Sequence, residues 1–304
     1  MHSRLLVYVN TDLLLLFAIS LTLHLTTAVF RPQSDQQLKA AVDECVKLPP
    51  IGDCSAGSHG PIGDWDVSAV TNMDGIFSHA STFNQDLSKW DVSGATNMRA
   101  MFSDASAFNH ELSKWDVSSV TDMGYMFLGA SAFNQDLSKW DVSAVTDMAS
   151  MFSRASAFNE DLSRWDVSAV TKMAFMFASA SAFNKDLSKW DVSAVTNMGS
   201  MFSRATAFNQ DLSKWDVSAV TLMGYMFSRA SAFNQDLSNW DVSAVTNMRS
   251  MFHGASAFKH KLCGVAWVNS KAGKGDMFTD SSGSISSKVC TTAKPGDDYG
   301  CECH

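Results

Sequence analysis

The stretch FNQDLSKWDVSAVTDMASMFSRASA, from Phe133 to Ala157, decides the fold because it is one of eight near-copies. Each copy is 25 residues long and carries one tryptophan at the same place; these are Trp65, Trp90, Trp115, Trp140, Trp165, Trp190, Trp215 and Trp240. A fixed period between about 20 and 50 residues is typical of solenoids and repeat arrays, in which each unit packs on its neighbours. We therefore predict one elongated domain of eight coils over residues 63–262.

Apolar residues that recur in every copy predict the path of one coil. From Val145 onward they fall at i, i+3, i+6, i+7 and i+10, which is one face of a helix, and Ser143 is placed as its N-cap. Residues 134–140 are too few for a helix and predict a strand and a turn. Leu137 and Trp140 are three residues apart, so the strand has to end or bend between them. We expect an α/β repeat that is a leucine-rich-repeat-like solenoid, with short parallel strands on one face and short helices on the other.

The N-terminus has the layout of an export signal. Arg4 precedes a leucine-rich run over residues 13–25, and the small residues at 26–28 provide a cleavage site. We therefore predict a signal peptide over 1–28 and a secreted or cell-surface protein. The alternative is an uncleaved membrane anchor, because the apolar stretch from Leu13 to Phe30 is about long enough to span a bilayer.

All six cysteines lie outside the repeats; they are Cys45, Cys54, Cys263, Cys290, Cys301 and Cys303. An even number on an exported chain indicates disulfides. Eight coils at ~4.8 Å spacing separate the two groups by roughly 35–40 Å, whereas a bridge needs α-carbons within ~7 Å. We therefore predict a Cys45–Cys54 bridge and leave the pairing of the C-terminal four open. A zinc corner at Cys301, Cys303 and His304 is the less favoured alternative to disulfides there.

Segments without the repeat flank the coils, as the ends of a solenoid require. The N-terminal cap spans 29–62, where Ser34 and Gln37 form a capping box that predicts a helix from Asp35 to Val46. The C-terminal cap and tail span 263–304. There Trp267 and the stretch at 276–278 resemble a degenerate last coil.

The strings W-D-V-S-x-V-T-x-M-x-x-M-F and F-N-x-D-L-S, read across the units, closely resemble the 25-residue repeat of BspA-like leucine-rich repeat surface proteins. The resemblance covers all eight units. It implies a leucine-rich-type solenoid displayed at a cell surface, with adhesion or protein binding proposed for some members. It implies no catalytic residue, and this chain lacks the lipobox cysteine of the lipoprotein members.

Residues that hardly change from unit to unit form ladders, which we assign to structure. One acidic ladder is Asp86, Glu111, Asp136, Asp161, Asp186, Asp211 and Asp236; a second follows each tryptophan, from Asp66 to Asp241. At ~4.8 Å in water, like charges repel by only about 1 kcal/mol, and lysines lie nearby to offset this. A solvated face is therefore favoured over a calcium ladder. The asparagine ladder from Asn84 to Asn234 predicts buried amides that bridge coils.

Positions that vary between units are the better candidates for recognition. One such row contains His110, Glu160 and Lys185, and another carries an aromatic residue on every second coil, at Tyr125, Phe175 and Tyr225. Three aromatic side chains about 10 Å apart form an exposed apolar stripe, or else each ring simply lies across a small neighbour. The residues alone leave these two interpretations equally favoured.

Composition excludes several function classes. The net charge of −8 argues against a nucleic-acid partner, and no zinc-protease, nucleophile-elbow or phosphate-loop motif is present, so we expect neither an enzyme nor a bound cofactor or metal. We predict a binding or adhesion scaffold whose partner is a protein or glycan. The alternatives are a self-assembling wall or matrix protein and, less favoured, an ice- or mineral-binding surface.

Overall fold

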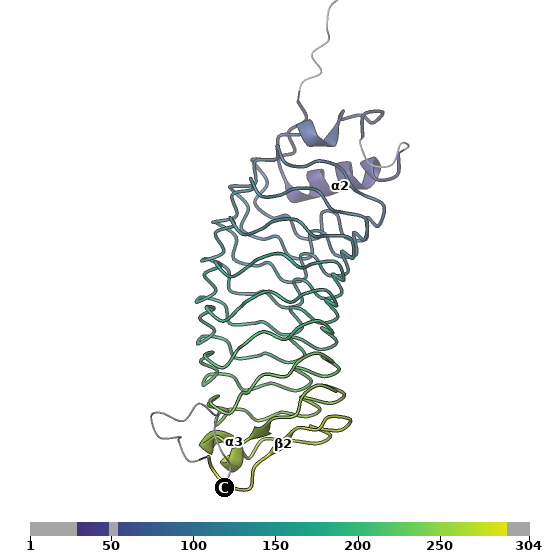
Figure 1. The fold of residues 1–304 in the computed structure, drawn as a ribbon. Helices are drawn as coiled ribbons and strands as arrows, with labels where there is room; N and C mark the ends of the chain where they lie inside the picture. The colour runs from purple at the N-terminus through teal and green to yellow at the C-terminus, as the bar shows by residue number, and fades with distance from the viewer. Residues whose placement is uncertain (1–28, 49–53, 291–304) are drawn as a thin grey trace, which may run out of the picture.

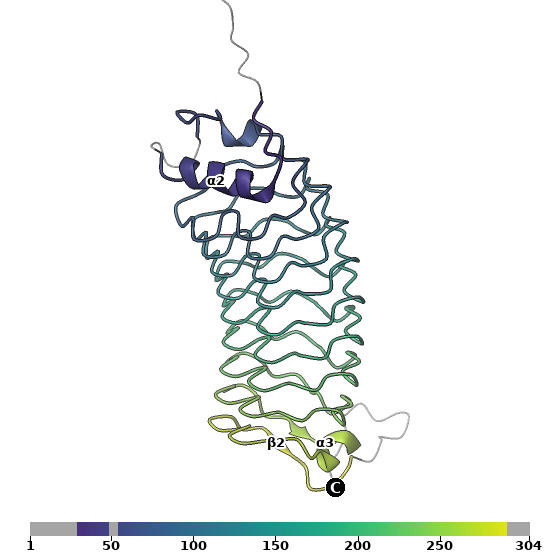
Figure 2. The same ribbon diagram turned by 180° about the vertical axis from the view of Figure 1, so that it is seen from behind.

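The computed structural model describes residues 29–48 and 54–290, which form an elongated stack of coils with a cap at each end (Figure 1). Regular secondary structure is confined to the caps. The N-terminal cap has helix α2 (Asp35–Cys45) and the short 3-10 helix η1 (Ile62–Asp64). The C-terminal cap has strand β1 (Lys261–Leu262), helix α3 (Val265–Asn269) and strand β2 (Ser284–Ile285), which pairs in parallel with β1. The reverse view shows the same coils following one another without a break between the caps (Figure 2).

Backbone hydrogen bonds between coils hold the stack together. In the unit around Trp140, alternate N–H groups donate to the next coil: Met148 to Lys172, Ser150 to Ala174, Phe152 to Met176 and Arg154 to Ala178, at 2.7–3.0 Å. The residues between them close turns within the coil, as Met151 does on Met148. Isolated parallel bridges mark the same register along the stack, from Asn72 with Asn97 to Leu222 with Asn247, and Asn247 continues the series with Gly273, one residue further along. Each coil therefore satisfies its backbone through its neighbours.

The helix expected from Val145 does not form, and this part of the prediction is wrong. Ser150 and Arg154 have φ of 58° and 60°, which is the left-handed region that an α-helix cannot contain. Turns closed between residues three apart also bring every third side chain to one side, so the apolar spacing suited both structures. The strand expected over 134–140 is also absent. The parallel bridges between coils lie instead at the residue that follows the Val-Thr pair.

Each tryptophan is a buried corner that ties its coil to the preceding one. The backbone N–H of Trp140 donates to the Leu137 carbonyl at 3.1 Å, so the bend expected between these two residues is a turn. Indole Nε1 of Trp165 donates to the Leu137 carbonyl at 3.0 Å, and its ring stacks on that of Trp140 with centroids 6.5 Å apart. Burial therefore comes with a satisfied polar atom.

Two phenylalanine ladders run through the centre of the stack. Phe102, Phe127 and Phe152 stack at 5.6 Å between ring centroids, and Phe133 lies 4.1 Å from Phe127 within one coil. These rings are fully buried. Methionines and valines fill the space around them, so one continuous apolar core runs along the stack.

Both caps close the ends of this core. Helix α2 begins at an N-cap in which Ser34 accepts from the Gln37 N–H, as predicted, and it buries Leu38 and Val42. At the other end Trp267 donates to the Leu237 carbonyl at 2.8 Å. Phe252 stacks on Phe278 at 5.5 Å, so the segment after Leu262 forms a partial ninth coil.

Two disulfides staple the caps. Cys45 joins Cys54 with α-carbons 4.9 Å apart, as predicted, and Cys263 joins Cys290 at 5.1 Å. The proposed signal peptide over 1–28, and Cys301 and Cys303 with the alternative zinc corner, lie outside the described residues.

We predict that Trp165→Ala lowers the free energy of unfolding by ~3–5 kcal/mol, because it empties a buried indole site and removes the indole hydrogen bond to the Leu137 carbonyl, which keeps only its bond from the Trp140 N–H. Stability in a stack is a sum of unit and nearest-neighbour terms, so calorimetry should show the unfolding transition split into two. Lys185→Ala, at an outward position, is the control and should change stability by less than ~0.5 kcal/mol. A Trp165→Ala variant that melts like the parent would exclude a core role for the tryptophans.

The disulfides give a second prediction. Non-reducing peptide mapping should recover the Cys45 peptide joined to Cys54 and the Cys263 peptide joined to Cys290. Cys290→Ser should destabilise the C-terminal cap by about 3–4 kcal/mol, since the loop it closes spans 27 residues and the entropy of the unfolded chain rises when it opens. A peptide that joins Cys263 to Cys301 or Cys303 would contradict the pairing.

Candidate binding face

The carboxylate after each tryptophan stabilises a turn. Asp191, for example, accepts from the backbone N–H of Ser193 at 3.0 Å. The hydroxyl of that serine, followed by its N–H, holds the pKa of six of these carboxyls below the ordinary value; they are Asp66, Asp116, Asp166, Asp191, Asp216 and Asp241. The same bond in every coil indicates a structural role, in agreement with the assignment from sequence.

The asparagine ladder also joins coils. The side-chain oxygen of Asn134 accepts from the Asn159 N–H at 2.7 Å, and Asn159 does the same for Asn184 at 2.9 Å. The bridging role was predicted correctly, but the expected burial was wrong: the ladder lies at the surface, half-buried or exposed. Because water competes for these amides, their hydrogen bonds serve mainly to fix the register between coils and add little stability through burial.

The row that contains His110, Glu160 and Lys185 borders this ladder. In other coils the row is glutamine, and Gln210 donates to the side-chain oxygen of Asn184 at 2.8 Å. The three candidates are half-buried. The pKa of Asp161 is lowered chiefly by the Ser163 N–H and hydroxyl, with a smaller contribution from the positive charge of Lys185. Part of the variation in this row therefore serves contacts between coils.

The aromatic row lies on another segment of the coil, and there the backbone itself is unusual. Tyr125, Phe175 and Tyr225 have φ of 60–62°, a left-handed conformation that costs a bulky residue about 1–3 kcal/mol. Phe175 and Tyr225 leave 49% and 42% of their surface exposed, and Leu222 beside them leaves 38%. The serines on the intervening coils at this position are buried. Two of the three rings therefore remain exposed, which favours the apolar-stripe interpretation for Phe175 and Tyr225.

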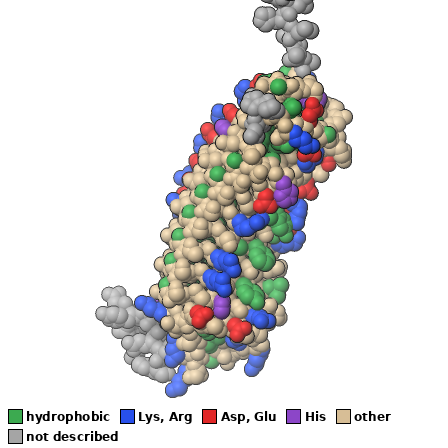
Figure 3. All heavy atoms as spheres, turned by 90° about the vertical axis from the view of Figure 1, so that its right-hand side faces the viewer, with side chains coloured by type: hydrophobic (Ala, Val, Ile, Leu, Met, Phe, Trp, Pro, Cys, Tyr) green, Lys and Arg blue, Asp and Glu red, His purple; other side chains and the backbone are tan. Residues whose placement is uncertain are grey.

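These side chains belong to a surface that we call the turn face. It comprises the outward positions of the T-x-M-x-x-M-F segment and of the two residues after it, in four rows that begin at Asn72, Asp74, Gly75 and His79 and repeat every 25 residues. Viewed from the side, hydrophobic side chains gather at mid-stack with Lys and Arg side chains next to them (Figure 3). Within the described repeats, Phe175, Leu222 and Tyr225 are the exposed large hydrophobic residues.

The two halves of the turn face differ in charge. In the first four coils it carries four acidic residues and two cations, namely Asp74, Asp104, Asp122, Asp147, Arg99 and Arg154. In the last four coils it carries four cations and no acidic residue; the cations are Lys172, Arg204, Arg229 and Arg249. The positive half is thus the half that exposes Phe175 and Tyr225.

Tyr125 differs from the other two aromatics because its surroundings are already satisfied. The Arg99 guanidinium lies 4.5 Å from the centre of its ring and 3.7 Å from Asp122. Arg154 pairs in turn with Asp104 at 3.0 Å across two coils. The structure therefore groups Phe175 and Tyr225 into one exposed site and leaves Tyr125 outside it.

Arg204 and Arg229 are the cations at the centre of this site. Lys172 on one side pairs with Asp147 at 2.9 Å, and Arg249 on the other lies 3.8 Å from Asp276. Among the described residues, Arg204 and Arg229 form no ion pair. Sequence reasoning missed both arginines and Leu222. The sequence does contain a signal for them, because the four rows of the turn face carry no acidic residue in the coils after Asp147.

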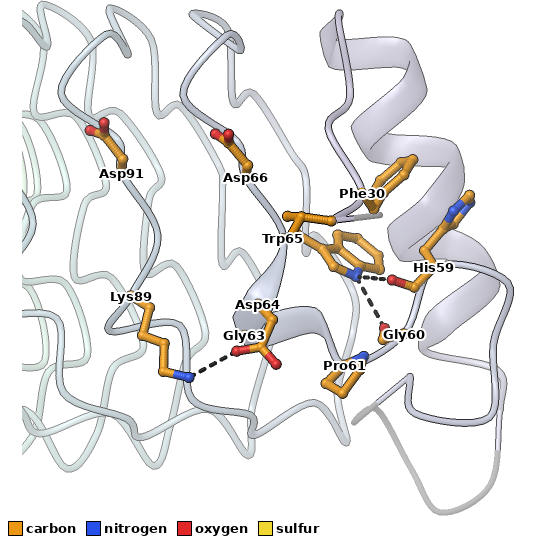
Figure 4. A pocket seen from close by; sticks show the side chains of 11 residues that line it. Phe30, His59, Gly60, Pro61, Gly63, Asp64, Trp65, Asp66, Lys89 and Asp91 are labelled. Atoms are coloured by element: carbon orange, nitrogen blue, oxygen red, sulfur yellow. Dashed lines mark hydrogen bonds and ion pairs between the residues drawn. The ribbon is translucent and has the colours of Figure 1, made fainter. Parts of the chain in front are cut away.

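A pocket of about 570 Å³ lies at the N-terminal cap, between η1 and the first coils (Figure 4). Several of its polar groups pair with one another: Trp65 donates to the His59 and Gly60 carbonyls, and Lys89 pairs with Asp64 at 2.8 Å. The His59 ring stacks on Phe30 with centroids 3.8 Å apart. These contacts make the pocket part of the cap's own packing.

Within residues 29–48 and 54–290, no cluster of three or more His, Cys, Asp or Glu side chains is arranged to hold a metal ion. No helix in these ranges has the length and apolar content needed to cross a bilayer.

The stacked coils and their ladders define a repeat protein. Its sequence matches, over residues 52–165, 110–207, 157–267 and 186–288, the family described as "Mycoplasma protein of unknown function, DUF285", and the chain belongs to that family. No curated protein and no solved structure matches it significantly.

The hydrogen-bonded carboxylates predict how stability depends on pH. A pKa that is lower in the folded chain than in the unfolded one adds stability above the unfolded value, and this stability is lost as pH falls through the folded value. The melting temperature should therefore be nearly level from about pH 7 to 5 and fall below about pH 4. The double variant Asp191→Asn with Asp216→Asn keeps an oxygen acceptor but no ionisable group, so calorimetry should show a smaller acid-induced drop. An equal drop in variant and parent would contradict this role of the ladder.

Proposed function

We propose that the protein is a non-catalytic binding scaffold, secreted or displayed at a cell surface, in which the turn face of the last four coils contacts the partner. The observation that carries the proposal is the exposure of Phe175 and Tyr225 on left-handed backbone. The backbone is left-handed at this position in all eight coils, so the exposed aromatic side chain, and not the backbone, distinguishes these two coils.

Extracellular location is supported by three features. Two disulfides staple the caps, and such bridges are rare in reducing compartments. The N-terminal sequence has the layout of a signal peptide. The 25-residue repeat resembles that of BspA-like leucine-rich repeat surface proteins, for some of which adhesion has been proposed; we extend both the solenoid class and the surface role to this chain on that resemblance.

A self-assembling matrix protein is the weaker alternative. Open-ended assembly along the stack would need the terminal coils to expose their core and backbone. Helix α2 covers the first coils, and the partial ninth coil with Trp267 covers the last. Capped ends favour a discrete particle, which leaves the side faces for recognition.

The proposal predicts binding that depends on the turn face. On an array of extracellular-matrix proteins and polysaccharides, the parent should bind at least one component, and Phe175→Ser with Tyr225→Ser should abolish that binding. Serine occupies the same left-handed position at Ser150, Ser200 and Ser250, so the variant should fold.

The control places glutamine, the usual residue of the other variable row, at two of its positions: His110→Gln with Lys185→Gln should bind like the parent. Equal binding by the serine variant would remove the turn face from the proposal. Light scattering that shows concentration-dependent polymers in place of a monodisperse particle would favour the matrix alternative.

A further inference from the structure

We propose that the turn face of the last four coils binds an anionic glycan chain that lies along the stack, with Arg204 and Arg229 holding its acidic groups and Phe175 and Tyr225 stacking on its sugar rings. This inference rests on the proposed function and names the chemical class of its ligand.

Charge selects an anion. Arg204 and Arg229 occupy the same position on adjacent coils, so their backbones lie only about 5 Å apart. Their carboxylate neighbours are absent on this half of the face, and the flanking cations Lys172 and Arg249 are engaged with Asp147 and Asp276. Two exposed guanidinium groups without a partner, in a chain of net charge −8, repel each other unless an anion binds. A guanidinium presents a planar fork that matches the oxygens of a carboxylate or sulfate.

The aromatic side chains select a ligand with flat apolar faces. Phe175 and Tyr225 lie two coils apart, at about 10 Å, and both rings are close to half exposed. One face of a pyranose ring consists of C–H groups, which stack on an aromatic ring and remove apolar surface from water. Leu222, exposed at 38% on the coil of Tyr225, extends this apolar surface.

The repeat spacing favours a linear polymer over a folded partner. Rings recur at every second coil and guanidinium groups on successive coils, so the face offers similar contacts at regular intervals along one axis. A polysaccharide presents sugar and acidic groups at regular intervals too, and adjacent contacts then act together. A peptide is disfavoured as a β-strand added to this face, because the backbone N–H groups of Phe175 and Tyr225 already donate to the next coil at 2.9 and 2.8 Å.

The test measures the affinity of the full chain, by isothermal calorimetry, for four probes of matched length. These are a heparin oligosaccharide, an oligogalacturonate, a neutral malto-oligosaccharide and an oligo-glutamate peptide. At least one anionic glycan should bind, more weakly as salt rises, and roughly tenfold or more tighter than the neutral glycan and the peptide. The anionic glycan that binds identifies sulfate or carboxylate as the acidic group.

Variants separate the contacts. Arg204→Ser with Arg229→Ser should weaken anionic-glycan binding by about tenfold or more, and Phe175→Ser with Tyr225→Ser should do the same. Serine stands at Ser179 in the arginine row with φ of 59°, so the backbone accepts the change. The matched controls are Arg154→Ser, whose arginine is paired with Asp104, and Tyr125→Ser, whose ring is covered by Arg99. Both controls should bind within about twofold of the parent.

Several outcomes would overturn the inference. Equal affinity for the neutral glycan would remove the role of charge, and equal affinity for the oligo-glutamate would indicate an acidic protein as the partner. Anionic-glycan binding that all four variants retain would place the site elsewhere. If no glycan binds while a matrix protein is captured in a Phe175- and Tyr225-dependent way, this inference fails and the proposed scaffold stands; if the turn face captures nothing, both fail.

Discussion

The structure depends on one constraint: every coil must satisfy its backbone through the coils beside it. The segment from Met148 to Arg154 sends alternate N–H groups to the next coil, while Thr146 donates to the preceding one. No sheet of ordinary length forms, because turns interrupt the chain every three or four residues. The coils must therefore have equal length and register, since an insertion would displace every donor that follows it. This is the physical reason for a strict 25-residue period.

The same constraint explains which residues repeat. Trp165, Phe152 and Asn159 each contact their counterparts or the backbone of adjacent coils. A change at such a position disturbs two interfaces at once. Residues that make no such contact are free to differ, which is why function is sought in the varied rows. His110 and Lys185 show the limit of that argument, because their row also contributes to contacts with neighbouring coils.

Sequence reasoning predicted the period, the buried tryptophans, the helix of the N-terminal cap and the Cys45–Cys54 bridge, because each rests on spacing or local chemistry. It failed within the coil, where a three-residue apolar spacing fits a helix and a series of turns equally well. The deciding signal was glycine: Gly75, Gly129 and Gly254 stand at left-handed positions that most other units fill with larger residues. The site was predicted only in part, since contacts between side chains determine which residues of a row remain exposed and unpaired. Phe175 and Tyr125 occupy the same row, and only the fold reveals that Arg99 covers one of them.

The left-handed aromatic side chains connect the scaffold to its proposed role. A glycine or serine at position 175 or 225 would suit the backbone as it does in other coils, and it would leave a smooth small-residue surface. Large rings at these positions add conformational strain and expose apolar surface to water, and neither effect improves the stack. The adjacent arginines lie on successive coils without carboxylate partners, so the repulsion between their positive charges is not offset by an ion pair. A bound anionic glycan would cover the exposed rings and neutralise the arginines, and its binding free energy would offset the backbone strain that remains.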